Sequence, residues 1–254
     1  MTYRGRHRPG LSRRRLLAAG GIAAVGILGG GFVWRALDEE SSRRTGARDR
    51  SGETTTGGSN DGDLGVIATQ PSTEAFAHYH ELRLVLPARN PVAVCYHEAV
   101  YPDAVELEPI GKCRRNANRT KFNPPATKPG PGYIVMSSRG RGTPATSAVD
   151  LVLREKTPVL APVSGRVVKL RRYRYEGTHD IRIEVAPPEA PELRVVVIHV
   201  DDVRVRQGDE LLAGETILGV PRVFGFTSQI DYYVPGRNPH VHVEVKHRAE
   251  EQPG

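Results

Sequence analysis

The chain has 254 residues with Lys+Arg 36 against Asp+Glu 29, a length that allows one or two domains. The formal net charge of +7 belongs to the N-terminus, because residues 1–37 hold seven arginines and no acid, and the rest of the chain is balanced. A neutral remainder offers no phosphate-binding surface, which excludes a nucleic-acid partner. A hydrophobic fraction of 38% with Gly 27 and Pro 20 indicates that part of the chain is not packed.

Residues 1–37 predict a leader for export. Ser12, Arg13 and Arg14 precede an apolar, Gly/Ala-rich stretch, and the pattern resembles a twin-arginine signal. The stretch is long enough to span a bilayer, and its end shows no clear cleavage site, so the leader is either a signal or a lasting membrane anchor. The arginines before it would stay cytoplasmic. We therefore expect an extracytoplasmic protein, membrane-anchored or secreted.

Residues 38–68 predict a flexible linker between the leader and a folded region. They consist mostly of Ser, Thr, Gly and mixed charge, with almost no large apolar residue. Such a segment buries too little surface to offset the entropy lost on ordering.

Cys95 and Cys113 are the only two cysteines. In an exported protein a lone pair is expected to form a disulfide, which would stabilise an N-terminal extension over residues 69–135. The alternative is two separate thiols without a role. The absence of a C-x-x-C pair excludes a zinc ribbon and a dithiol redox site.

From about residue 80 the chain consists of short apolar or β-branched runs, most of them bounded by Gly, Pro, Asn or Asp, and this pattern predicts an all-β domain. One segment, Thr73–His80, could form a short helix. The runs expected to be strands are Leu82–Leu86, Tyr133–Met136, Val149–Leu153, Val159–Leu170, Ile181–Val185, Leu193–Val200, Thr216–Val220 and Val241–Val245.

Two segments sharpen the fold prediction. Thr157–Val168 reads as a strand, a Ser-Gly turn and a second strand, and glycines punctuate short apolar pieces over Val203–Gly219. This is the pattern of a barrel-sandwich hybrid, which biotinyl and lipoyl carriers share. A carrier needs a lysine at a hairpin tip in a Met-Lys-Met or Asp-Lys context, and none of the lysines of this domain has it. The carrier function is therefore excluded.

Three histidines are candidates for metal binding or proton transfer: His199, His240 and His242. His240 and His242 alternate along the last apolar run, so they share one face of a strand together with Glu244. His199 ends an earlier apolar run. Two imidazoles on one face can bind a single zinc ion, or one can bind the metal while its neighbour handles protons.

The order of these motifs resembles the lysostaphin/LytM-type zinc endopeptidases of peptidase family M23. Asp150 precedes the hairpin, His199 ends a strand, and the chain closes with Pro239-His-Val-His242-Val-Glu-Val. The resemblance covers about residues 143–245 and implies a peptidase-like domain over 136–254. It also implies a duplicated hybrid motif and action on the peptides of peptidoglycan.

The resemblance implies a role for each matching residue. Asp150 and His242 match zinc ligands, and His199 and His240 match the histidines that orient or deprotonate the zinc-bound water and stabilise the oxyanion. The family's third ligand is a histidine four residues before the aspartate, and here that residue is Thr146. Catalytic zinc normally has three protein ligands, so weak or absent zinc binding is expected. Four other histidines could in principle replace the missing ligand, but we expect them to be ordinary polar residues: His78, His80, His97 and His179.

Three interpretations stay open at this point. The first is a cell-wall domain with an impaired zinc site, which binds peptidoglycan or a cell-wall enzyme. The second is an active zinc-dependent murein endopeptidase with an unusual third ligand. The third is a structural β module without a wall ligand. Zinc content of the purified protein separates the first two.

Overall fold

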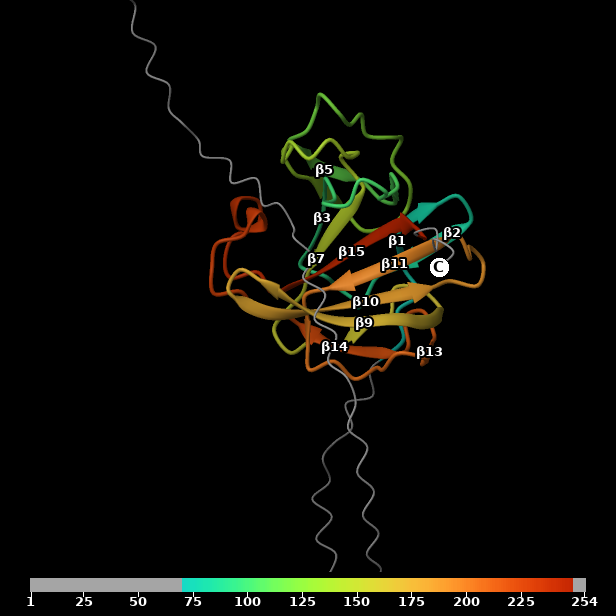
Figure 1. The fold of residues 1–254 in the computed structure, drawn as a ribbon. Coiled ribbons are helices and arrows are strands. Elements are labelled where there is room, and N and C mark those ends of the chain that lie inside the picture. The colour runs from blue at the N-terminus through green and yellow to red at the C-terminus, as the bar shows by residue number, and fades with distance from the viewer. Residues whose placement is uncertain (1–69, 249–254) are drawn as a thin grey trace, which may run out of the picture. The chain divides into compact units, whose positions relative to one another are not determined.

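The computed structural model describes residues 70–248, which belong to the compact unit Asp63–Gly254 (Figure 1). The expected leader over residues 1–37 and the linker over 38–68 lie outside the described residues. Within residues 70–248, no helix has the length and apolar character needed to cross a membrane.

The described chain is all-β, as the sequence predicts, with one short 3-10 helix, η1 (Gln229–Tyr232), as its only helical element. Its longest strands are the hairpin partners β9 and β10. The strands are β1 (Ala75–Tyr79), β2 (Leu82–Val85), β3 (Ala93–His97), β4 (Glu108–Pro109), β5 (Cys113–Asn116), β6 (Tyr133–Val135), β7 (Ala148–Val152), β8 (Val159–Leu160), β9 (Gly165–Tyr175), β10 (Thr178–Ala186), β11 (Leu193–Ile198), β12 (Val200–Asp201), β13 (Glu210–Leu211), β14 (Ile217–Pro221) and β15 (His240–His247).

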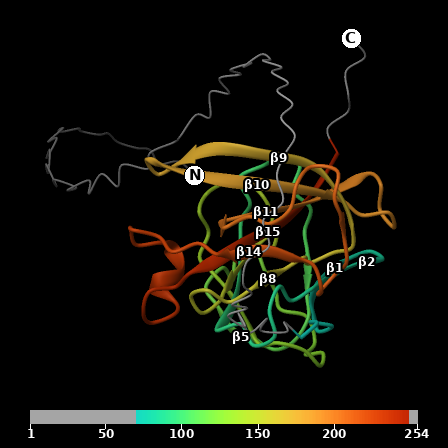
Figure 2. The same cartoon turned by 90° about the horizontal axis from the view of Figure 1, so that it is seen from below.

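Nine strands form one large sheet in the order β13-β9-β10-β11-β15-β7-β3-β6-β5, and two three-stranded sheets have the orders β2-β1-β4 and β12-β14-β8. Figure 2 shows β14 and β8 on one side of β9, β10 and β11. Buried side chains of all three sheets join one hydrophobic core, among them Phe76, Leu84, Val195, Leu218 and Val243. The small sheets therefore cover one face of the large sheet.

The opposite face of the large sheet is polar at its centre. Successive strand residues point to opposite faces, so Val149 and Leu151 of β7 enter the core while Asp150 points away from it. On β15, Val241 and Val243 enter the core in the same way, and the histidines between them face the polar side. This alternation fixes the register and selects which side chains meet outside the core.

The helix expected over Thr73–His80 is wrong, because Ala75–Tyr79 forms strand β1. It pairs with β2 on one side and β4 on the other. A tight turn at His80, whose φ is 49°, connects β1 to β2. The pairing buries Phe76 completely, and this tertiary contact outweighs the helix propensity of the local sequence.

The expected N-terminal extension, residues 69–135, is part of the same structural unit as the rest of the described chain. Strand β3 is an internal strand of the large sheet, hydrogen-bonded to β7 in antiparallel and to β6 in parallel orientation. Its residues Val94 and Tyr96 lie in the shared core. The boundary expected after residue 135 therefore falls within a continuous sheet.

The predicted disulfide between Cys95 and Cys113 is wrong, because both cysteines are free. Cys95 on β3 is registered with Ile134 on β6, and Cys113 on β5 is registered with Tyr133 on the other side of β6. Two strand spacings separate the cysteines by about 10 Å, whereas a disulfide needs Cα atoms within about 7 Å.

Candidate metal centre

The pairing of β7 with β15 brings together two of the residues that the sequence singled out. His242 lies directly opposite Asp150 in the register. Directly opposite residues of antiparallel strands share a face and have neighbouring Cβ atoms. His242 Nδ1 accordingly lies 2.9 Å from Asp150 Oδ1.

A third side chain reaches the same point from β3. His97 is registered opposite Ala148, so it lies diagonally from Asp150 on the same face of the sheet. The small methyl group of Ala148 leaves room for the imidazole, whose Nε2 lies 3.0 Å from Asp150 Oδ1. The rings of His97 and His242 have centroids 5.2 Å apart.

His97, Asp150 and His242 thus form a cluster that we call the triad, with one ligand atom from each lying within 4.8 Å of the others. All three residues are buried. Two imidazoles and one carboxylate are a ligand set that suits zinc.

The tautomer of His97 fits a metal ligand. Its Nδ1 lies 2.8 Å from the carbonyl oxygen of Glu98, to which Nδ1–H can donate, and this leaves Nε2 with a free lone pair. Nε2 is buried and faces Asp150 Oδ1 at 3.0 Å without the geometry of a hydrogen bond, and it has no other partner within the described residues. An unsatisfied buried nitrogen is costly unless something binds it. Burial, together with the charge of Arg139, lowers the pKa of His97 to about 4, so the ring is neutral at neutral pH, as a metal ligand must be.

His242 is oriented by a second carboxylate. Its Nε2 lies 3.3 Å from Glu244 Oε2, and Glu244 lies 3.8 Å from Nη1 of Arg182. Carboxylates commonly orient metal-ligating histidines in this way. Burial opposes protonation of His242, but Asp150 and Glu244 raise its pKa to about 9, so a metal ion at Nδ1 would replace a proton.

His199 stands beside the triad with its own carboxylate partner. Asp180 Oδ1 accepts a hydrogen bond from the backbone N–H of His199 at 3.2 Å. Asp180 Oδ2 lies 2.5 Å from Nδ1 of the His199 ring. The φ of His199 is 66°, an uncommon left-handed conformation for a residue with a side chain, of the kind that concentrates at functional sites. Burial lowers the pKa of His199 to about 4 although Asp180 opposes this.

The His240 ring has the rings of His199 and Phe224 as neighbours. The ring centroids of His240 and His199 are 5.4 Å apart, and Phe224 lies 4.6 Å from His240. Tyr175 and Phe224 both lie 4.9 Å from His199. His240 Nδ1 lies 2.8 Å from the Asn238 carbonyl oxygen, so both imidazoles use Nδ1 for orientation and keep Nε2 for a substrate or water.

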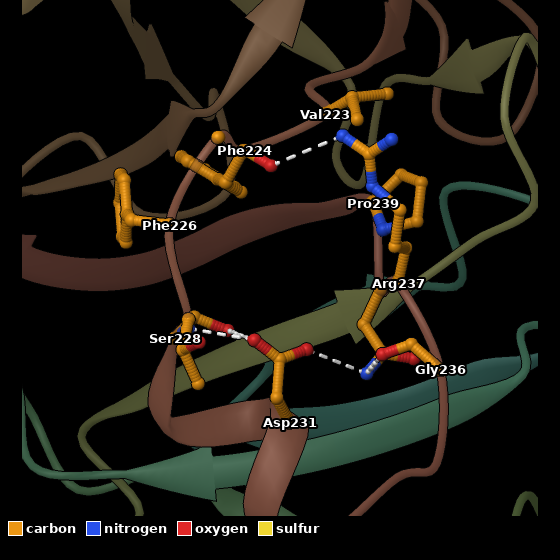
Figure 3. A pocket seen from close by; sticks show the side chains of 11 residues that line it. Val223, Phe224, Phe226, Ser228, Asp231, Gly236, Arg237 and Pro239 are labelled. Atoms are coloured by element: carbon orange, nitrogen blue, oxygen red, sulfur yellow. Dashed lines mark hydrogen bonds between the residues drawn. The ribbon is translucent and has the colours of Figure 1, made fainter.

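The loop between β14 and β15 lines a cavity of about 390 Å³, and Pro239, the residue before β15, is part of its wall (Figure 3). Phe224 and Phe226 line one side of this cavity, and Arg237 lines the other. Asp231 fixes the loop, since its carboxylate accepts the Ser228 N–H at 2.6 Å and the Asn238 amide at 2.7 Å.

On the other side of the triad, a buried carboxylate holds the loop after β6. The Glu98 side chain is fully buried. It accepts hydrogen bonds from Ser138 Oγ at 2.6 Å, from the backbone N–H groups of Arg139 at 2.9 Å and Arg141 at 3.0 Å, and from Lys121. Burial opposes ionisation, but these donors lower the pKa of Glu98 to about 2. The loop thereby presents Arg139 to the triad, with Nη2 3.5 Å from Asp150 Oδ2.

The structure brings Asp150, His199, His240 and His242 together as the sequence analysis expected. Thr146 is fully buried, and its hydroxyl has no partner within the described residues. The prediction that His97 is an ordinary polar residue is wrong, because His97 is one of the three members of the triad.

The three remaining candidates for the missing ligand, His78, His80 and His179, lie outside the triad. His78 pairs with Glu108 at 3.4 Å, and His80 and His179 are exposed. Asp180 and Glu98 were not predicted from the sequence. The two-residue alternation of Asp180, Arg182 and Glu184 on one strand is a signal that could have indicated a polar face.

Comparison with known proteins gives a partial likeness. No protein-family model matches the sequence, and no curated protein matches it. Among solved structures, the solution structure of lysostaphin is 24% identical, with a TM-score of 0.32, and the match covers 42% of this chain and 38% of that one. The catalytic domain of the antimicrobial peptidase lysostaphin from Staphylococcus simulans is 23% identical, with a TM-score of 0.32, over 44% of this chain and 73% of that one.

A variant catalytic domain of the prophage-encoded M23 protein EnpA from Enterococcus faecalis is 21% identical, with a TM-score of 0.30, over 40% of this chain and 67% of that one. The chain thus spans well under half the length of the lysostaphin chain in its solution structure.

Proposed function

We propose that this protein is an extracytoplasmic zinc-dependent endopeptidase that cleaves peptides of peptidoglycan. The observation that carries the proposal is the convergence of His97, Asp150 and His242 on one point, with His199 and His240 beside it. Three ligands from three adjacent strands leave a further position open, which is the arrangement that catalytic zinc sites use.

A zinc ion held by the triad would supply a Lewis acid that lowers the pKa of a water molecule to about 7. The residues of the chain supply the proton transfers. His199 is the proton acceptor, because its neutral Nε2 is available and the carboxylate of Asp180 at Nδ1 stabilises the imidazolium that results. The same proton can then pass to the leaving amine.

His240 has a carbonyl oxygen rather than a carboxylate at Nδ1. An imidazolium there would have no adjacent counter-ion, so we assign His240 to orienting the water through a hydrogen bond at Nε2. The ring of Phe224 flanks both histidines, and the ring of Tyr175 flanks His199. These rings shield the site from bulk water, which strengthens its electrostatic interactions.

The active interpretation is preferred to the impaired one because His97 supplies the ligand that Thr146 does not. The sequence resemblance to lysostaphin/LytM-type enzymes supports a peptidoglycan substrate, and the expected leader supports action outside the membrane. In the impaired interpretation the domain would bind the wall or a cell-wall enzyme without cleaving it.

Metal analysis of the purified full chain after dialysis tests this proposal. We expect one zinc ion per chain in the unchanged protein, its loss in His97→Ala, and its retention in His78→Ala, which removes an imidazole that lies outside the triad. Peptidoglycan digestion should follow the zinc content. An unchanged protein without zinc would restore the impaired interpretation, and zinc retained by His97→Ala would exclude His97 as a ligand.

A further inference from the structure

Arg139 is a cation at the edge of the triad. Its Nη2 contacts Oδ2 of Asp150 at 3.5 Å, whereas His97 and His242 contact the other carboxylate oxygen. The Arg139 side chain is 22% exposed. The guanidinium therefore reaches both the metal centre and the solvent from which a substrate arrives.

The position of Arg139 is fixed before any ligand binds. Glu98 accepts its backbone N–H at 2.9 Å, and Gln229 accepts a hydrogen bond from its Nε. These contacts leave Nη1 without a hydrogen bond to any residue in the described part of the chain. An arginine held in this way has little conformational entropy left to lose when a ligand binds. Its planar guanidinium can donate two hydrogen bonds to one carboxylate.

The charge around Arg139 favours an anion. Asp150 is the acidic side chain in contact with its guanidinium, and a metal ion at the triad would share that carboxylate. Arg141 adds a second positive charge nearby, since its Nη1 donates to the Glu98 carbonyl oxygen at 2.9 Å and its backbone N–H binds the same Glu98 carboxylate oxygen as that of Arg139. Glu98 does not offset this excess, because its negative charge is already paired with the ammonium group of Lys121.

We infer that Arg139 is a specificity-determining residue that binds a free carboxylate of the peptide substrate close to the scissile bond. The inference rests on the proposed endopeptidase function and adds the chemical class of substrate. Because Arg139 contacts a triad residue directly, the carboxylate belongs to a residue within about two Cα spacings, each about 3.8 Å, of the reacting carbonyl. Peptides with a carboxamide at that place would be poorer substrates.

The test measures calorimetric binding of acetyl-Ala-Ala and acetyl-Ala-Ala-amide to the full chain, with and without zinc. We expect the carboxylate form to bind about tenfold to a hundredfold tighter than the amide, as a charge-assisted pair provides. Arg139→Gln should abolish this preference without weakening amide binding, and Arg139→Lys should restore part of it. The matched control is Arg174→Gln, which removes the same charge from an exposed position and should keep the preference.

Zinc content and peptidoglycan digestion, measured on every variant, separate the two proposals. Normal zinc and digestion with no carboxylate preference in the unchanged protein would overturn the subsite and leave the endopeptidase proposal intact. Loss of zinc from Arg139→Gln would also overturn it, because Arg139 would then serve to hold Asp150 in place. Absent zinc and digestion in the unchanged protein would instead overturn the proposed function.

Discussion

His97 Nε2 and Asp150 Oδ1 lie 3.0 Å apart, although the two residues come from different strands that are distant in the sequence. The antiparallel pairing of β3 with β7 produces this contact. In the proposed metal centre, a neighbouring strand would therefore supply the ligand that the resembled family places four residues before the aspartate. A metal centre needs a particular arrangement of side chains in space, and the order of its ligands along the chain is secondary.

Thr146→Val should raise stability and leave zinc binding unchanged. The Thr146 hydroxyl is buried without a partner, and burying such a group costs about 1–3 kcal/mol. Valine has nearly the same shape without that cost, and each kcal/mol shifts the unfolding temperature by about 2–4 °C, so we expect a rise of about 2–12 °C. Thr143→Val is the matched control and should lower it, because the Thr143 hydroxyl donates to Ala99 O at 2.9 Å. Loss of zinc in Thr146→Val would show that this hydroxyl is a ligand.

Asp180→Asn should reduce peptide cleavage without removing zinc. The amide cannot stabilise a protonated His199 as the carboxylate does, and it can impose the wrong tautomer on the ring. We expect kcat to fall by roughly a hundredfold or more. Steady-state kinetics and metal analysis on the same preparation check this, with the exposed Asp202→Asn as control. An unchanged kcat would remove His199 from the proton-transfer role.

Cys95 and Cys113 should both be reduced thiols in the isolated protein. Cys95 is fully buried, and burial together with Asp150 raises its pKa to about 12. We expect a thiol reagent to label Cys113 alone in the native protein and both cysteines after unfolding, without prior reduction. A reductant should leave the unfolding temperature unchanged. A mass showing the loss of two hydrogens between these cysteines would contradict the sheet order β3-β6-β5.

Glu98→Gln should destabilise the protein. The substitution exchanges a buried acceptor of four hydrogen bonds for an amide that turns an N–H group toward other donors. We expect a loss of about 2 kcal/mol of unfolding free energy, measured by denaturant unfolding. Glu106→Gln at an exposed position should be neutral. Equal stability of both variants would show that Glu98 does not hold the loop that carries Arg139.

Local pattern in the sequence was enough for several features. Alternation of apolar and polar residues predicted most strands, among them β7 and β15, and placed His240, His242 and Glu244 on one face. These features depend on a period of two residues, which is visible without any knowledge of which strands pair.

Only the tertiary structure decided which distant residues meet. Strand β3 pairs with β7, which brings His97 to Asp150, and β6 separates Cys95 from Cys113. The carboxylates of Asp180 and Glu98 likewise acquire their partners from other segments. The order of the strands in the sheet depends on how the apolar faces of all strands pack into one core. Because this packing involves the whole chain, no local sequence pattern shows which strands pair.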